Sequence, residues 1–72
     1  MKKVSINISG HQTSFSLEPI FFDYLQLVAK SKGISVNQLV KEIDEKREID
    51  QNLSSNIRVY LFKHLNELRK NG

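Results

Sequence analysis

Three polar side chains at alternating positions, Gln12, Ser14 and Ser16, are the residues of this sequence best suited to binding another molecule through hydrogen bonds. A glutamine amide donates and accepts at once, and a serine hydroxyl can do either. Phe15 and Leu17 alternate with them, so in an extended segment the polar and apolar side chains face opposite ways. Taken alone, this pattern is typical of a surface strand whose polar side faces solvent.

Catalytic and metal-binding chemistry has little support in the residues. Ser54 and Ser55 have no base nearby and are typical helix-capping residues. His11 and His64 lie far apart in a chain without cysteine, so there is no recognisable zinc spacing. We therefore expect neither an enzyme nor a protein with a metal or a cofactor.

The hydrophobic pattern places the polar residues on the second of two strands. Apolar residues at every other position predict one strand over 3–8 and another over 12–17, joined by a turn at Ser9 and Gly10. The first strand has three possible pairings. It can fold back on the second as a hairpin, extend a ribbon shared by two chains, or pair along an edge of a dimer.

Apolar spacings of three and four residues then predict two helices. The first runs over 19–32 and ends at Gly33 in a left-handed conformation. Ser35 is a good N-cap for the second, which we expect over 36–48.

A third helix is expected over 54–69, capped by Asn52 or Ser54. Its apolar residues cover more than one stripe. A helix of this kind normally packs on two surfaces. The two surfaces expected here are its own domain and a partner.

Length and composition limit the class of protein. A single domain over 1–72, with no cysteine, has a small core and no disulfide to support it. We expect support from a second copy, because one chain should not be able to cover all of its apolar side chains. The expected dimer core consists of Phe15, Leu17, Leu25, Val36, Leu39, Val40 and Ile43.

The net charge of +3 is unevenly distributed, with an acidic segment over 41–53 between two basic ends. A basic balance favours an acidic partner, and nucleic acid comes first. No apolar run approaches the length that spans a bilayer. We therefore expect a cytoplasmic protein without a membrane partner.

Two short motifs give the sequence a family resemblance. Residues 12–43 resemble the strand, helix, turn and second helix of ribbon-helix-helix DNA-binding domains. A bacterial subgroup carries a GHxTSxSLE segment and a later NLSSxIR segment, which are matched at 10–18 and 52–58. The resemblance implies a mainly helical dimer with a short β-ribbon formed by strands of both chains. The third helix and the first strand would be additions.

The resemblance also implies a function, that of a sequence-specific transcriptional regulator that binds double-stranded DNA as a homodimer. The intermolecular ribbon would enter the major groove, which accommodates two strands. Phosphates would be held by the second helix's N-terminus and by lysines. The implied base contacts are Gln12, Ser14 and Ser16, and the implied phosphate contacts are Lys2, Lys3, Lys32, Ser35, Val36 and Asn37.

An alternative function belongs to another class. The chain can be an antitoxin-like or scaffold module whose third helix binds a protein partner through its apolar residues. The two functions can coexist in one protein.

Overall fold

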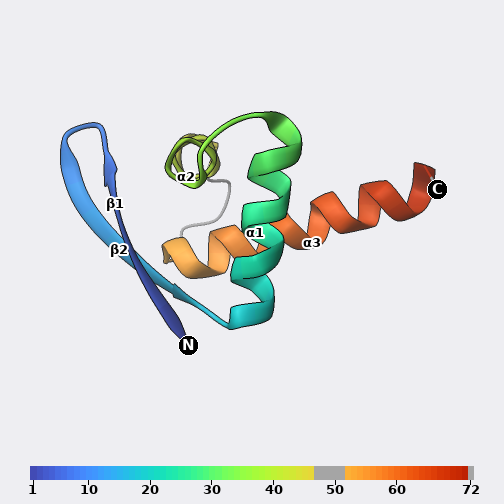
Figure 1. Cartoon of the computed structure of the whole chain (residues 1–72), viewed down its shortest axis with the longest axis horizontal. Coiled ribbons are helices and arrows are strands. Elements are labelled where there is room, and N and C mark those ends of the chain that lie inside the picture. The colour runs from blue at the N-terminus through green and yellow to red at the C-terminus, as the bar shows by residue number, and fades with distance from the viewer. Residues whose placement is uncertain (47–51, 72) are drawn as a thin grey trace.

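A computed structural model describes residues 1–46 and 52–71 of the chain. Strands β1 (Lys2–Ile8) and β2 (His11–Leu17) form a hairpin, which helices α1 (Pro19–Lys32), α2 (Val36–Glu45) and α3 (Leu53–Asn71) follow. The hairpin lies at one side of the molecule and the helices pack against it, with α3 crossing α1 and extending beyond it (Figure 1). The fold is mainly helical, with one two-stranded antiparallel ribbon.

The hairpin resolves the open pairing of the first strand. β1 pairs antiparallel with β2 of the same chain, with Val4 opposite Phe15 and Ser5 opposite Ser14. Ser9 and Gly10 form the connection with φ of 52° and 82°. Positive φ at both central residues defines a type I′ turn, whose twist matches that of the flanking strands.

The helix ends follow local capping chemistry. Pro19 occupies the first turn of α1, and Gly33 ends that helix in the left-handed conformation expected from the sequence, at φ 71°. The Ser35 hydroxyl accepts a hydrogen bond from the Gln38 N–H at 3.0 Å and so caps α2. Asn52, one of the two predicted caps of α3, accepts from the Ser55 N–H at 2.9 Å.

Two helices have bounds that differ from the sequence prediction. α2 ends at Glu45 instead of 48, and residues 47 and 48 of the predicted range lie outside the described residues. α3 begins one residue earlier and ends two residues later than predicted. Helix ends commonly vary by this much, and the Asn52 cap fixes the earlier start.

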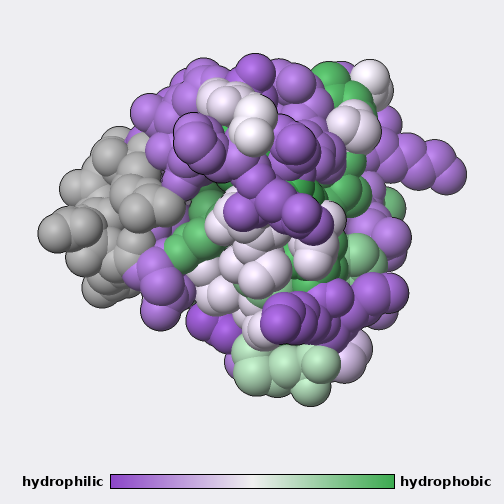
Figure 2. Space-filling view, turned by 90° about the vertical axis from the view of Figure 1, so that its left-hand side faces the viewer, coloured by the Kyte–Doolittle hydropathy of each residue, from purple (hydrophilic) through white to green (hydrophobic). Residues whose placement is uncertain are grey.

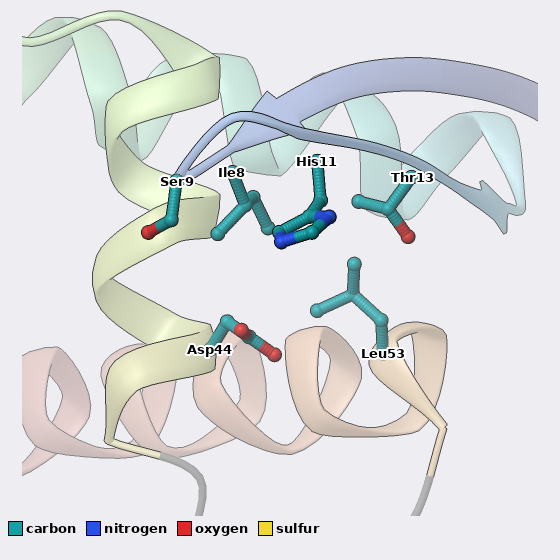
Figure 3. Close-up of a pocket in the computed structure, with 6 residues that line it drawn as sticks. All are labelled: Ile8, Ser9, His11, Thr13, Asp44 and Leu53. Atoms are coloured by element: carbon teal, nitrogen blue, oxygen red, sulfur yellow. The ribbon is translucent and has the colours of Figure 1, made fainter.

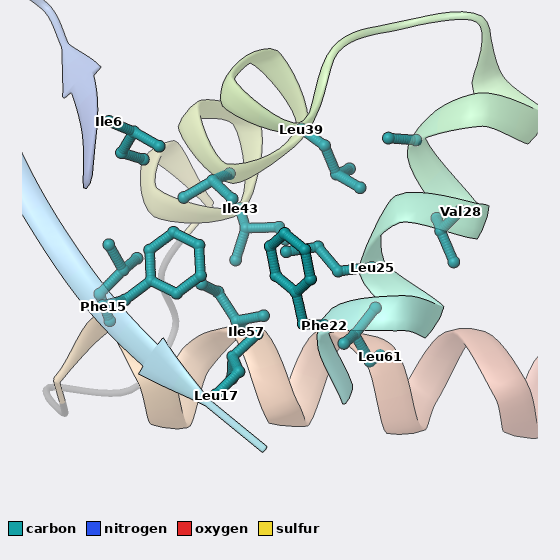
Figure 4. Packing of buried hydrophobic residues seen from close by; sticks show 13 residues of the cluster. Ile6, Phe15, Leu17, Phe22, Leu25, Val28, Leu39, Ile43, Ile57 and Leu61 are labelled. Atoms are coloured by element: carbon teal, nitrogen blue, oxygen red, sulfur yellow. The ribbon is translucent and has the colours of Figure 1, made fainter. Parts of the chain in front are cut away.

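A single hydrophobic core takes side chains from all five elements (Figure 4). Leu17, Leu25, Leu39 and Ile57 are completely buried in it. Each fully buried side chain of this size contributes about 1.5–3 kcal/mol relative to exposure. The complete set of buried apolar residues is Ile6, Phe15, Leu17, Phe22, Leu25, Val28, Ala29, Leu39, Val40, Ile43, Leu53, Ile57 and Leu61.

This core corrects the argument for a dimer. We expected that one chain could not cover its apolar side chains, and that argument is wrong. Six of the seven residues of the expected dimer core are buried within the chain, and Val36 is half-buried. The cover comes from β1 on one side and from Leu53, Ile57 and Leu61 of α3 on the other.

Candidate nucleic-acid interface

The hairpin has one polar face and one apolar face. Because side chains alternate along each strand, the register places six polar side chains together on the side away from the core. We call this surface the outer face. It is mostly hydrophilic to neutral in the view onto the hairpin side of the molecule (Figure 2). Its members are Lys3, Ser5 and Asn7 of β1 and Gln12, Ser14 and Ser16 of β2.

The three residues expected to contact bases all belong to this face. Gln12 and Ser14 are exposed, whereas Ser16 is half-buried and its N–H donates to the Ser54 hydroxyl at 3.1 Å. Sequence reasoning missed Ser5 and Asn7, which lie opposite Ser14 and Gln12. Their alternation with apolar residues was visible, but only the hairpin pairing places them on the same face.

Asn37 fixes the start of α2 beside the hairpin. Its side-chain amide pairs with the backbone of Asn7, accepting from the N–H at 3.1 Å and donating to the C=O at 3.0 Å. The Asn7 side chain accepts from the Gly10 N–H at 3.0 Å, which supports the turn. The Asn37 side chain is therefore engaged by the hairpin, and a phosphate contact at this residue would use its backbone N–H.

The first turn of α2 has the chemistry of an anion site. The Ser35 hydroxyl accepts a hydrogen bond from the N–H of Gln38. The N–H groups of Val36 and Asn37, in contrast, have no acceptor within the helix. The helix dipole gives this end a partial positive charge. The Asn7–Asn37 contacts place that end next to the outer edge of β1.

The three predicted lysines are not gathered together. Lys3 belongs to the outer face. The Lys2 ammonium lies 4.5 Å from the centre of the Phe22 ring, on the core side of the hairpin. Lys32 lies where α1 meets the other two helices. Its ammonium is 3.8 Å from a Glu42 carboxylate oxygen and 3.5 Å from the Tyr60 hydroxyl.

The two sequence motifs meet in space where β2 ends and α3 begins. Ser54 accepts from the Ser16 N–H, and Arg58 donates to a Glu18 carboxylate oxygen at 3.0 Å. Two hydrogen bonds lower the pKa of the Glu18 carboxyl below its ordinary value. The larger effect comes from a backbone hydrogen bond at Glu18, and the smaller one comes from the Arg58 side chain. These motif residues hold the hairpin against α3.

The lowered pKa predicts a pH-dependent contribution to stability. Because the folded state favours the charged carboxylate, its stabilisation is present above the ordinary pKa of about 4.5 and is lost as pH falls through the lower folded value. The Glu18→Gln variant should melt below the wild type at neutral pH, and the gap should shrink below that ordinary pKa.

Thermal unfolding followed by circular dichroism across this pH range measures the gap. In Arg58→Gln the pH dependence should weaken without vanishing, because the backbone hydrogen bond at Glu18 remains. A gap of constant size from neutral to acidic pH would contradict this role of Glu18.

A pocket of about 380 Å³ opens on the opposite side of the hairpin tip, towards α2 and α3 (Figure 3). His11 lies between Ile8 and Thr13 there, with Asp44 and Leu53 across from it. The lining residues are Ile8, Ser9, His11, Thr13, Asp44 and Leu53. Because they face away from the outer face, the pocket is separate from the candidate interface.

Two other kinds of site can be assessed in the described part of the chain. Residues 1–46 and 52–71 contain no cluster of three or more His, Asp or Glu side chains that could hold a metal ion. None of the helices within these ranges is both long enough and apolar enough to cross a membrane.

The sequence matches the model of a known protein family. The sequence model of a family described as a ribbon-helix-helix domain matches residues 1–65. Neither the curated proteins nor the solved structures gave a significant match. The matched region contains both strands, α1, α2 and most of α3.

Proposed function

Because this chain belongs to the ribbon-helix-helix domain family, we propose that it is a sequence-specific DNA-binding protein that acts as a homodimeric transcriptional regulator. Members of this family are typically non-catalytic DNA-binding proteins, with DNA and a second copy as their general partners. The observation that carries the proposal is the outer face. It presents exposed amide and hydroxyl groups on an antiparallel two-stranded ribbon.

The hairpin has the dimensions that the major groove requires. Its two strands lie about 5 Å apart, and the groove is about 12 Å wide. If the hairpins of two chains paired edge to edge, the outermost of the four strands would be about 14 Å apart, which exceeds the width of the groove. We therefore propose that the hairpin of one chain takes the place of the intermolecular ribbon that the family resemblance implied.

Individual roles follow from the chemistry of the side chains. Gln12 can bind both the N6 amino group and N7 of an adenine, which gives it the strongest discriminating role. Ser5 and Ser14 can donate or accept with little preference between bases. Lys3 and the start of α2 would bind phosphates and set the register without reading sequence.

Selection of bound duplexes from a random pool, at two salt concentrations, tests this function. The wild type should enrich a common sequence at both. Gln12→Ala should lose about 1–3 kcal/mol of discrimination at one position. Lys3→Gln should weaken binding to all sequences alike. The loss of one phosphate contact should also reduce the slope of log affinity against log salt concentration by about one.

The matched control is Gln26→Ala, which removes an exposed glutamine from α1. It should leave both affinity and selected sequence unchanged. Absence of enrichment at either salt concentration would count against DNA binding. An equal loss of selected and random DNA in Gln12→Ala would count against base reading.

A second candidate function is the protein-interaction module. Three large apolar side chains of α3, Phe62, Leu65 and Leu68, are exposed. They could contact a protein partner while the hairpin contacts DNA.

A further inference from the structure

The tip of the hairpin lacks the support that the core gives to the rest of the two strands. Ile6, Phe15 and Leu17 are the hairpin side chains buried in the core. Beyond them the tip lies over the pocket of about 380 Å³, and Ser9 and His11 are exposed (Figure 3). A two-stranded hairpin without packing is only marginally stable in water. The position of the tip therefore depends on contacts other than core packing.

The turn at the tip needs such contacts as well. Ser9 has a φ of 52°, a left-handed conformation that a serine adopts only at a cost in free energy. The Asn7 side chain accepts a hydrogen bond from the Gly10 N–H at 3.0 Å and so holds the turn in this conformation. The turn is therefore held in place only as firmly as Asn7 itself.

Asn37 holds Asn7 through both of its backbone groups. The Asn37 Oδ1 accepts from the Asn7 N–H at 3.1 Å, and the Nδ2 donates to the Asn7 C=O at 3.0 Å. The side-chain amide thus pairs with the edge of β1 as a neighbouring strand would. α2 is itself anchored in the core by Leu39 and Val40. Asn37 therefore joins the tip of the hairpin to a fixed helix.

This contact bears directly on Gln12. Gln12 lies opposite Asn7 in the register of the hairpin. The Cβ atoms of such a pair are about 4.5–5.5 Å apart. A glutamine that binds both N6 and N7 of one adenine needs both of its amide atoms in place, so a small displacement of its strand weakens the contact. The hold on Asn7 therefore also sets the position of Gln12.

We propose that Asn37 is a positioning residue for base reading. Its side chain fixes the hairpin tip against α2, so that Gln12 meets its base pair in one register. The N–H groups at the same helix start are those that would bind a phosphate, so the base contact and the phosphate contact are held at a fixed separation. This role replaces a phosphate contact by the Asn37 side chain. The inference rests on the DNA reading of the proposed function.

Amide hydrogen exchange of the free protein tests the contact without DNA. In Asn37→Ala, the amides of Asn7 and Gly10 should lose about tenfold or more of their protection. The Ser5 amide, two residues earlier on the same edge of β1, should not change. Asn7→Ala should lower the protection of Gly10 but not that of residue 7, because Asn37 binds the backbone there.

The matched control is Gln38→Ala. Gln38 is the next residue of α2, and its side-chain amide donates to a Glu42 carboxylate oxygen at 3.3 Å instead of to the hairpin. This variant should keep the wild-type protection at Asn7 and Gly10 and select the wild-type DNA sequence. Circular dichroism verifies that each variant is folded.

Selection of bound duplexes tests the positioning role. Asn37→Ala should lose about threefold to tenfold of the preference at the base pair that Gln12→Ala affects, in line with one neutral hydrogen bond or more. The double variant should show no further loss at that base pair beyond Gln12→Ala alone, because Asn37 acts there through Gln12. A residue that merely stabilises the fold would not produce this position-specific, non-additive loss.

Four results would overturn the proposal. Unchanged protection of Asn7 in Asn37→Ala would show that the contact does not hold the hairpin. Losses that add in the double variant would give Asn37 a DNA contact of its own, and equal weakening on all sequences would make it a phosphate ligand. A wild-type sequence that Asn37→Ala selects equally well would reject the positioning role and retain DNA reading. A wild type without any enrichment would instead reject the proposed function, and the reading role of Asn37 with it.

Discussion

Joining the two hairpin strands through the double variant Lys3→Cys and Ser16→Cys is expected to stabilise the oxidised form by about 3 kcal/mol over the reduced form and to leave their DNA affinities equal. These residues lie opposite each other in the register. The Ser16 N–H points away from β1 to Ser54, which marks the pair as one without mutual backbone hydrogen bonds. Cα atoms in such pairs are about 4.5 Å apart, within the range that a disulfide spans.

The absence of native cysteine makes this experiment unambiguous. Oxidised and reduced forms of the same variant differ only in the cross-link, so the loss of the Lys3 charge affects both equally. Denaturant unfolding measures the stabilisation, and titration with the selected duplex measures binding. Binding by the reduced form alone would contradict the hairpin as reading element, because the strands would then have to separate to pair with another chain.

Truncation of a buried side chain should destabilise the protein about as much as the disulfide stabilises it. Leu39 of α2 is completely buried in the core. Leu39→Ala should lower the free energy of unfolding by about 2–5 kcal/mol. This is a large share of the stability of so small a domain. Ile43→Val, with an expected loss of about 0.5–1.5 kcal/mol, provides a variant that stays folded.

The control for the core is Leu27→Ala, which removes an exposed leucine of α1. At a concentration where the protein is monomeric, it should change the free energy of unfolding by less than about 0.5 kcal/mol. If Leu39→Ala and Leu27→Ala lowered the free energy of unfolding equally, the core would not be completed within one chain. A wild type that is unfolded at the concentration where it is monomeric would contradict the same claim.

Local structure was readable from the sequence because its signals are local. Alternating apolar residues gave both strands, and Gly33 and Ser35 marked the turn between the first two helices. Alternation also placed Gln12 and Ser14 on the side away from Phe15. Each of these features depends on neighbouring residues and on periods that the backbone geometry dictates.

The pairing of the first strand could not be predicted. An apolar face at every second position fits a hairpin, a shared ribbon and a dimer edge equally well. Ser9-Gly10 is a weaker signal for a type I′ turn than Asn-Gly, because serine tolerates positive φ less readily. The roles of Ser5 and Asn7 in the outer face depended on that pairing.

Which part of α3 is buried and which part is exposed could also not be predicted from the sequence. Its apolar residues indicated two surfaces, but their period is the same in both halves of the helix. Leu61 is buried and Leu65 is half-exposed because α1 crosses α3 near His64. That crossing depends on long-range packing, as do the contacts of Ser16 with Ser54 and of Glu18 with Arg58.

Titration of isotope-labelled protein with its selected duplex, followed by backbone amide NMR, tests the central claim most directly. The largest shift changes should fall on Ser5, Gln12 and Ser14 of the outer face and on Val36 and Asn37 at the start of α2. A duplex of scrambled sequence should perturb the hairpin far less. Shift changes confined to α3 and α1, with a silent hairpin, would contradict the outer face as the DNA-reading surface.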